Sequence, residues 1–338
     1  MRPQVQILLA PPARRPPTDF GRGSSAFRGR FIGSACRPNC PSVKGPTAAG
    51  TLGGLVEIVE REPAEPWEGL LASPVGGSAV GVLVLAGSSG RVMRERARLL
   101  ARQGITALTI RWFGGPGQPP GICEVPLETF TAAVDLLRGT GARRIGVLGV
   151  SKGAEAALLT AVRDDRVDVV AALSPSPLVW CNVGPGRDGV DRPYRSCWTW
   201  QGRPLPFVPM DDSWTPAEPE GGPVAIRGWY ERSERTFAAL LPAAEIPVEA
   251  ARAELILVAG GDDAMWPSGP YAERLAERRR AAGAGVRLIT RADAGHRPLF
   301  PGELPPPPSP TFRYGGTPEA DGLLGAAAWP HLLDALLG

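Results

Sequence analysis

Short apolar runs alternate with amphipathic segments along the chain, and this alternation restricts the fold more than any other feature. Runs with the length and composition of buried strands occur at 79–86, 105–113, 143–150, 167–175, 253–260 and 286–290. Segments with helical periodicity lie between or after them, at 94–104, 127–141, 154–162, 269–285 and 322–337. Repeated strand–helix–strand units are typical of a mostly parallel sheet with helices on both faces. We therefore expect a doubly wound α/β domain.

Two further segments complete the domain, which we expect to span residues 53–338. The alternating stretches 55–60 and 67–74 predict an antiparallel hairpin before the parallel strands. Between about residues 176 and 245 the regular pattern stops and Pro, Gly and Trp dominate. The insertion contains Trp198, Trp200, Phe207 and Trp214. These aromatic residues could form a lid or pocket wall, or they could belong to a surface excursion that packs on itself.

Residues 1–52 differ from the rest in composition. They are rich in Pro, Arg, Gly and Ser, and the first 50 residues carry eight Lys and Arg against one acid, Asp19. They show no sustained strand or helix period, so we expect a disordered extension. Upstream sequence included by a misplaced start is the favoured explanation, with a targeting peptide and a regulatory tail as alternatives.

The charge and cysteine content of the remaining chain excludes several classes. Beyond residue 50 the chain has 29 basic and 33 acidic residues, which does not fit a basic nucleic-acid-binding surface. No apolar run reaches the roughly 18 residues of a membrane span. The five cysteines form no C-x-x-C pair and favour neither a zinc site nor a disulfide framework. We expect a cytoplasmic protein with no nucleic-acid partner, and the sequence carries no signal of its oligomeric state.

Ser151 stands between two glycines at the point where an apolar strand run meets a helical pattern. The sequence there is Gly149-Val150-Ser151-Lys152-Gly153. Glycines at these two positions permit a sharp turn that displays the serine hydroxyl above the sheet edge. The following helix directs its first backbone N–H groups toward whatever the serine attacks. This context makes Ser151 the candidate nucleophile.

A serine nucleophile requires a histidine base that a carboxylate orients. His296 follows the last predicted strand, whereas His331 lies within the terminal helical pattern, so His296 is the candidate base. The loop after the strand at 253–260 holds two adjacent acids, Asp262 and Asp263. Asp263 is favoured as the triad acid, with Asp262 as the alternative. The chain order Ser, Asp, His is the one expected for an α/β-hydrolase fold.

The remaining parts of a hydrolytic site are donors for an oxyanion and contacts for the substrate. The candidate donors are the backbone amides of Lys152 and Ser88, with Gly87 and Ser89 as alternatives to Ser88. Gly87, Ser89, Arg91 and Trp266 are candidate substrate contacts. The chain lacks clustered metal ligands and nucleotide-binding glycine motifs, so we expect hydrolysis without a metal or cofactor.

Several separated motifs resemble the C-terminal catalytic domain of acyl-CoA thioester hydrolases and bile acid-CoA:amino acid N-acyltransferases. They are "GVLVLAGSSG" (81–90), "GVSKGAEAAL" (149–158), "LILVAGGDDAMWPS" (255–268), "AGHRPLFP" (294–301) and "GGTPEADGLLGAAAWPHLLDAL" (315–336). The resemblance extends over about residues 55–338. It implies an α/β-hydrolase in which Ser151, His296 and Asp263 cleave a small-molecule acyl thioester through an acyl-enzyme. Acyl-transferring members typically use a cysteine nucleophile, so the serine here favours hydrolysis.

Two other functions remain open at this stage. Fold and triad do not separate a thioesterase from a carboxylesterase or a dienelactone-hydrolase-like esterase. An elongated apolar pocket with arginines such as Arg91 or Arg94 at its mouth would favour an acyl-CoA, and a small closed pocket would favour a short ester. A non-catalytic, ligand-binding α/β-hydrolase is the third hypothesis, although such proteins usually lack a triad member.

Overall fold

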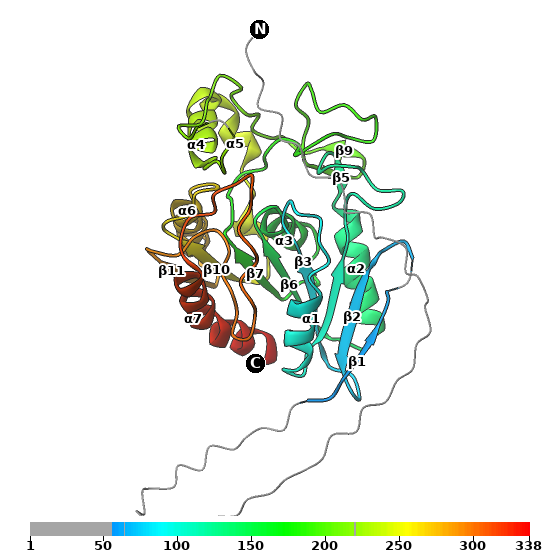
Figure 1. Ribbon diagram of the computed structural model, residues 1–338. Coiled ribbons are helices and arrows are strands. Elements are labelled where there is room, and N and C mark those ends of the chain that lie inside the picture. The colour runs from blue at the N-terminus through cyan, green and yellow to red at the C-terminus, as the bar shows by residue number, and fades with distance from the viewer. Residues whose placement is uncertain (1–55, 64, 220) are drawn as a thin grey trace, which may run out of the picture. The chain divides into compact units, whose positions relative to one another are not determined.

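An eight-stranded sheet forms the centre of the unit Leu55–Gly338 in the computed structural model (Figure 1). The structure describes residues 56–63, 65–219 and 221–338, and the extension predicted at 1–52 lies outside them. The strands of this sheet are β1 (Ile58–Arg61), β2 (Gly69–Pro74), β3 (Val80–Leu85), β4 (Thr106–Ile110), β6 (Arg144–Val150), β7 (Val169–Leu173), β10 (Glu254–Gly260) and β11 (Val286–Arg291).

The strand order is β1-β2-β4-β3-β6-β7-β10-β11. Strand β2 is antiparallel to β1 and β4, which confirms the predicted hairpin, and all other neighbours are parallel. This topology confirms the predicted α/β-hydrolase fold. Because β3, β6, β10 and β11 are parallel, their carboxyl ends lie at one edge of the sheet. The loops that carry the candidate catalytic residues all begin at that edge.

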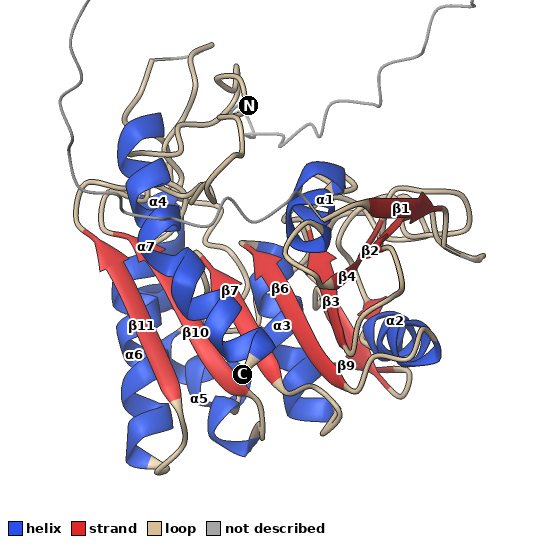
Figure 2. Ribbon diagram, turned by 90° about the horizontal axis from the view of Figure 1, so that it is seen from below, coloured by secondary structure: helices blue, strands red, loops and turns tan. Residues whose placement is uncertain are grey.

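Helices cover both faces of the sheet, and Figure 2 shows the strands as one layer between them. Helices α2 (Glu128–Gly139), α3 (Lys152–Arg163) and α6 (Ser268–Ala281) supply buried side chains to one apolar core. Helices α1 (Arg94–Ala101) and α7 (Pro318–Leu337) supply them to the core on the other face. Helix α7 begins four residues before the predicted pattern, because Thr317 accepts a hydrogen bond from the Ala320 amide at 3.2 Å and Pro318 occupies the first turn.

The segment at 176–245 is more regular than its sequence predicts. Its strands β8 (Trp198–Trp200) and β9 (Arg203–Pro204) form a small sheet with β5 (Val125–Pro126). Helix α4 (Arg227–Thr236) lies within it and is followed by the short turns η1 (Ala238–Leu240), α5 (Leu241–Ala244) and η2 (Val248–Ala250). The expectation that regularity stops here is wrong for α4, which buries only Trp229, Tyr230 and Ser233 and so has a very narrow apolar stripe.

The aromatic side chains of this segment pack on the protein rather than over the candidate site. Trp198 is fully buried, with its ring 5.4 Å from that of Trp112 and 5.9 Å from that of Phe130. Trp214 stacks on Trp229 at 5.8 Å. Among the described residues, none of the helices is both long and apolar enough to cross a lipid bilayer.

Candidate active site

Ser151 occupies the sharp turn between β6 and α3. Its φ of 56° and ψ of −122° lie in a region that is strained for any residue with a side chain. Neighbouring glycines make the turn sterically feasible: a Cβ on Gly149 would lie 2.0 Å from the Gly153 carbonyl oxygen, and one on Gly153 would lie 2.5 Å from that of Ala86. The turn therefore holds Ser151 at the sheet edge, where it is partly exposed and lines a cavity.

His296 and Asp263 form a buried pair beside this turn. The His296 Nδ1 and Asp263 Oδ2 atoms are 2.7 Å apart, and the two residues are 3% and 1% exposed. The other carboxylate oxygen, Oδ1, accepts hydrogen bonds from the amides of Met265 at 2.8 Å and Trp266 at 3.3 Å. An ionised carboxylate only accepts hydrogen bonds, so the Nδ1 of His296 carries the proton in this pair. Because Nδ1 contacts the carboxylate, Nε2 is the ring nitrogen that is left to accept a proton.

The alternative acid and the alternative histidine lie elsewhere. Asp262 is exposed, and its Oδ2 accepts a hydrogen bond from the Gly316 amide at 2.8 Å. His331 is exposed on α7, where its backbone carbonyl accepts a bond from Arg287. Of the two acids and two histidines in the sequence prediction, only Asp263 and His296 contact each other in the described residues.

The loop that carries His296 is fixed by its surroundings. The His296 amide donates to the Tyr314 carbonyl at 2.9 Å, and Ser174 Oγ donates to the His296 carbonyl at 3.0 Å. The neighbouring Gly295 amide donates to Asp321 Oδ1 at 2.6 Å. Burial raises the pKa of Asp321 to about 6. These contacts fix the backbone at Gly295 and His296.

Two loops supply backbone amides next to Ser151. Lys152 is the first residue of α3, and the first amides of a helix have no partner within it. Gly87, Ser88 and Ser89 follow β3 and line the same cavity as Ser151 and His296. A Cβ on Gly87 would lie 3.0 Å from the Ser151 Cβ, so the chain at Gly87 approaches the serine closely. Both predicted donor segments thus lie beside the candidate nucleophile.

The side chain of Lys152 turns into the protein, which the sequence does not indicate. Lys152 Nζ donates to Glu155 Oε2 at 2.9 Å, and the two side chains are 2% and 0% exposed. Burial lowers the pKa of Lys152, but the nearby Cys197, Glu155 and Tyr230 outweigh it and raise the pKa above its usual value. The lysine therefore stays charged inside the protein.

The cavity next to Ser151 and His296 has a volume of about 570 Å³. One wall comes from α1 and the residues just before it and includes Val92, Met93 and Leu99. Another wall comes from the chain after His296. That second wall contains Pro298, Leu299, Leu304, Pro306 and Pro307. Nothing in the sequence marks this Pro-rich loop as a pocket wall, since it has no period and no reactive side chain.

Arginines are the commonest charged residues of the cavity. Arg96 pairs with Glu303, its Nη2 being 2.6 Å from Glu303 Oε2, and so ties α1 to the Pro-rich wall. The other cavity arginines form no ion pair within the described part of the chain: Arg91, Arg94, Arg102 and Arg297. The cavity therefore combines an apolar lining with unpaired positive charge.

Two sequence predictions about aromatic residues do not fit this cavity. Trp266 is buried rather than a cavity-lining residue, because its indole donates to the Ser174 carbonyl at 3.1 Å and packs edge-on against His296. The residue of this loop that lines the cavity is Met265. The four aromatic residues that the sequence analysis named in the 176–245 insertion are likewise not among the lining residues: Trp198, Trp200, Phe207 and Trp214.

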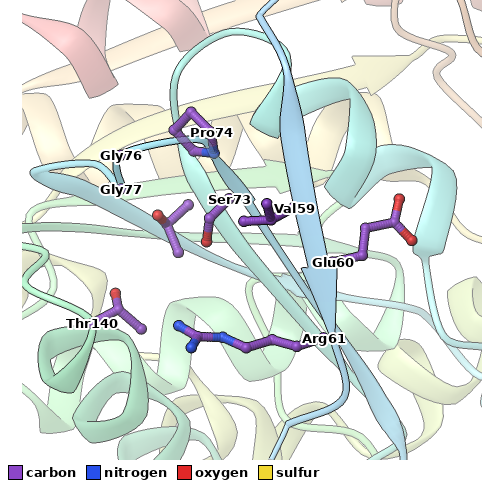
Figure 3. Close-up of a pocket in the computed structure, with 9 residues that line it drawn as sticks. Val59, Glu60, Arg61, Ser73, Pro74, Gly76, Gly77 and Thr140 are labelled. Carbon is purple, nitrogen blue, oxygen red and sulfur yellow. The ribbon is translucent and has the colours of Figure 1, made fainter.

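A second cavity of about 310 Å³ lies beside the β1–β2 hairpin. Figure 3 shows its lining, which includes Arg61, Ser73 and Thr140. Thr106, at the amino end of β4, also lines it, so this cavity lies at the sheet edge opposite to Ser151. None of the candidate catalytic residues contributes to it.

Comparison with known proteins adds a family to this geometry. Residues 125–336 match the family model described as BAAT / Acyl-CoA thioester hydrolase C terminal. The chain belongs to this family. The matched segment contains Ser151, Asp263 and His296, so the family domain includes the whole candidate site apart from the loop after β3 and the start of α1.

Curated relatives agree with this family membership. Acyl-coenzyme A thioesterase 6 of Mus musculus is 27% identical over 280 residues, which cover 78% of this chain and 60% of the mouse protein. Acyl-coenzyme A amino acid N-acyltransferase 2 of Rattus norvegicus is 27% identical over 232 residues, which cover 67% of this chain and 51% of the rat protein. The chain thus spans about half to two-thirds of the length of these relatives.

Solved structures were compared with this chain as well. An esterase of Pyrococcus furiosus is 17% identical, and its match covers 75% of this chain and 87% of the esterase with a TM-score of 0.42.

Proposed function

We propose that this family member is a serine hydrolase that cleaves acyl-CoA thioesters into a free acid and coenzyme A. The observation that carries the proposal is the 2.7 Å contact between His296 Nδ1 and Asp263 Oδ2 in the cavity that Ser151 also lines. Relatives that bear the name acyl-coenzyme A thioesterase support it.

The proposed reaction begins with attack of Ser151 Oγ on the thioester carbonyl carbon. As the new C–O bond forms, His296 Nε2 takes the hydroxyl proton, and Asp263 stabilises the resulting imidazolium. The negative charge that develops on the carbonyl oxygen is stabilised by the amides of Lys152 and Ser88, which lie beside the serine. The C–S bond then breaks, and His296 returns the proton to the departing thiol. Ser151 is left as an acyl ester.

Water completes the cycle by the same steps. His296 takes a proton from the water as its oxygen attacks the acyl-serine carbonyl. Collapse of the second tetrahedral intermediate breaks the ester bond, and the proton returns to Ser151 Oγ. The free carboxylic acid is released, and no metal or redox cofactor takes part in this scheme.

The cavity charges favour a thioester of coenzyme A over a simple ester. Arg91, Arg94, Arg102 and Arg297 are free of ion pairs among the described residues and line the cavity that contains Ser151. Guanidinium groups bind phosphates strongly through paired N–H donors. The phosphates of coenzyme A would match this charge, whereas a neutral alcohol leaving group would leave these arginines without an anionic partner.

The test compares the wild-type protein with Ser151→Ala on acyl-CoAs of increasing chain length and on p-nitrophenyl esters of the same acids. Free thiol and nitrophenol are followed separately. We expect thioester cleavage that requires Ser151 and exceeds ester cleavage. Ester cleavage without thioester cleavage would instead indicate a carboxylesterase or dienelactone-hydrolase-like enzyme. Absence of Ser151-dependent turnover of either substrate would refute the proposed hydrolase.

A further inference from the structure

The first turn of α3 contains a buried ion pair that the proposed reaction does not use. Glu155 lies one turn after the candidate nucleophile and is completely buried. Its carboxylate accepts three hydrogen bonds: from Lys152 Nζ at 2.9 Å, from the Trp198 indole nitrogen at 2.6 Å and from the Trp180 amide at 3.1 Å. A buried charge with this many donors is held in a single position.

Lys152 contributes to the candidate site through both its backbone and its side chain. Its backbone amide is one of the proposed oxyanion donors, and its side chain is the cation of this ion pair. The ammonium is bound to Glu155, so the Lys152 side chain cannot turn toward solvent. Such a movement would also shift the backbone of the strand–helix turn at Ser151, which we call the elbow. The position of the amide next to Ser151 is therefore linked to the presence of the Glu155 charge.

The same cluster reaches the other half of the site through aromatic contacts. The Trp180 ring lies 4.6 Å from the ring of Tyr230, and Tyr230 lies 5.3 Å from Trp266. Trp266 in turn packs edge-on against His296 at 5.7 Å, and Lys152 Nζ lies 5.9 Å from the centre of the Trp266 ring. The cluster thus joins the elbow, the segment at 176–245 and the loop of the Asp263–His296 pair.

We propose that Glu155 is a positioning residue for the reaction, which fixes the Lys152 amide and the His296 loop in their reactive arrangement. It touches neither the substrate nor the reacting atoms, and it acts through Lys152 on one side and through Trp180 and Trp198 on the other. The inference rests on the proposed serine hydrolase activity, but it does not depend on which acyl substrate the enzyme takes.

The alternative is a purely structural role, since breaking any buried ion pair destabilises a protein. The chain offers a matched control at the other end of the same helix. Asp164 follows α3, its side chain is 5% exposed, and its Oδ2 pairs with Arg166 Nη2 at 2.7 Å. Asp164→Asn removes a buried carboxylate charge whose partner, Arg166, is 40% exposed, and it does so without approaching the cavity.

The experiment measures kcat, KM and thermal stability for Glu155→Gln and Asp164→Asn. A misplacement of the reacting groups by about 1 Å costs about 100-fold in rate, so we expect Glu155→Gln to lower kcat by about 10- to 100-fold. We expect KM to change by less than about threefold and Asp164→Asn to keep the wild-type kcat. Similar losses of Tm in both variants, with kcat unchanged in Glu155→Gln, would overturn the inference.

The pH profile gives a second readout that a structural role would not move. Lys152 is surrounded by Glu155 on its own helix, Cys197 just before β8, Tyr230 on α4 and Cys181 in the segment at 176–245. Once Glu155→Gln removes the paired charge, burial favours the neutral amine, so Lys152 loses its proton at a lower pH. We expect kcat of this variant to change as alkaline pH removes the Lys152 proton, and we expect no such change in the wild type, whose Lys152 pKa is raised. A flat profile in the variant would contradict the role assigned to the pair.

A double variant covers the case in which Glu155→Gln does not fold. Lys152→Met/Glu155→Gln removes both charges, so no uncompensated charge is buried, and the glutamine oxygen can still accept hydrogen bonds from the Trp198 indole and the Trp180 amide. We expect it to recover Tm but not kcat. Wild-type kcat in the double variant would show that the ion pair is dispensable for the reaction.

A fluorophosphonate probe separates this inference from the choice of substrate, because it reacts with activated serines irrespective of the acyl donor. We expect Ser151 of the wild type to be labelled and Glu155→Gln to be labelled at least tenfold more slowly. Labelling of the wild type without thioester cleavage would reject the proposed substrate and leave the positioning role supported. An unlabelled wild type would overturn both proposals.

Discussion

Gly153→Ala tests whether the close contact between α3 and β3 sets the position of the candidate nucleophile. Gly153 is the second residue of α3, and it faces the carboxyl end of β3. An added Cβ would lie 2.5 Å from the Ala86 carbonyl oxygen and 2.7 Å from that of Leu85. Both atoms belong to the backbone, so no side chain can rotate to relieve the contact.

The size of the effect follows from these distances. An ordinary contact needs at least 3.4 Å, so α3 and the end of β3 must move apart by 0.9 Å at the closest point. Overpacking of this kind costs about 1–3 kcal/mol of folding stability, against about 1 kcal/mol that alanine gains over glycine within a helix. A shift approaching 1 Å at the elbow should lower kcat by about 100-fold.

The assay is Ser151-dependent turnover of an acyl-CoA, measured together with Tm. Gly322→Ala in α7 is the matched control, because a Cβ there meets nothing within 4 Å. We expect the control to keep its activity and to gain about 0.5–1 kcal/mol of stability. Wild-type kcat in Gly153→Ala would refute the argument that this contact fixes the nucleophile.

Three further predictions address the charged groups of the site. Asp263→Asn should lower kcat by about 10³- to 10⁴-fold, because His296 loses the group that orients it. The kcat of Asp262→Asn should stay within about threefold of wild type. Equal losses of kcat in the two variants would refute the assignment of Asp263 as the acid. Asp321 has a pKa of about 6 in the folded protein, against an ordinary value of 3.8. Its ionisation therefore lowers the free energy of unfolding as pH rises from about 4 to 6, and the loss remains at higher pH. Asp321→Asn keeps an acceptor for the Gly295 amide and should therefore raise Tm at pH 8 but not at pH 4, and an identical Tm shift at both pH values would contradict it. Changing Arg91 and Arg94 together to Gln should raise KM for an acyl-CoA at least tenfold and leave KM for a p-nitrophenyl ester unchanged. Arg143→Gln, at an exposed arginine outside the cavity, is the control. An equal rise of KM for both substrates would refute phosphate binding by Arg91 and Arg94.

The sequence predicts the parts of the fold that depend on local periodicity. The strands at β3, β6 and β10 are short apolar runs buried almost throughout, so their composition alone identifies them. Ser151 is identifiable because its glycines stand between a strand and a helix. The pairing of Asp263 with His296 follows from chain order, since parallel strands bring their carboxyl ends to one edge.

The features that sequence reasoning missed depend on tertiary contacts. A tryptophan-rich segment suits a pocket wall and a core equally well, and only the packing of Trp198 on Trp112 and Phe130 decides between them. Lys152 and Glu155 have the i, i+3 spacing of an exposed helix pair, yet both are buried because β8 and α4 cover them. The Pro-rich cavity wall after His296 is set by the ion pair between Arg96 and Glu303, which lie 207 residues apart.

The most direct test of the central claim is the mass of the protein after it is rapidly mixed with an acyl-CoA and quenched in acid. We expect an acyl adduct on the peptide that contains Ser151, formed together with a stoichiometric burst of free thiol. The adduct should be absent from Ser151→Ala and should accumulate in a variant with slowed water attack. Thiol release without an adduct on that peptide, or release that continues in Ser151→Ala, would contradict the account.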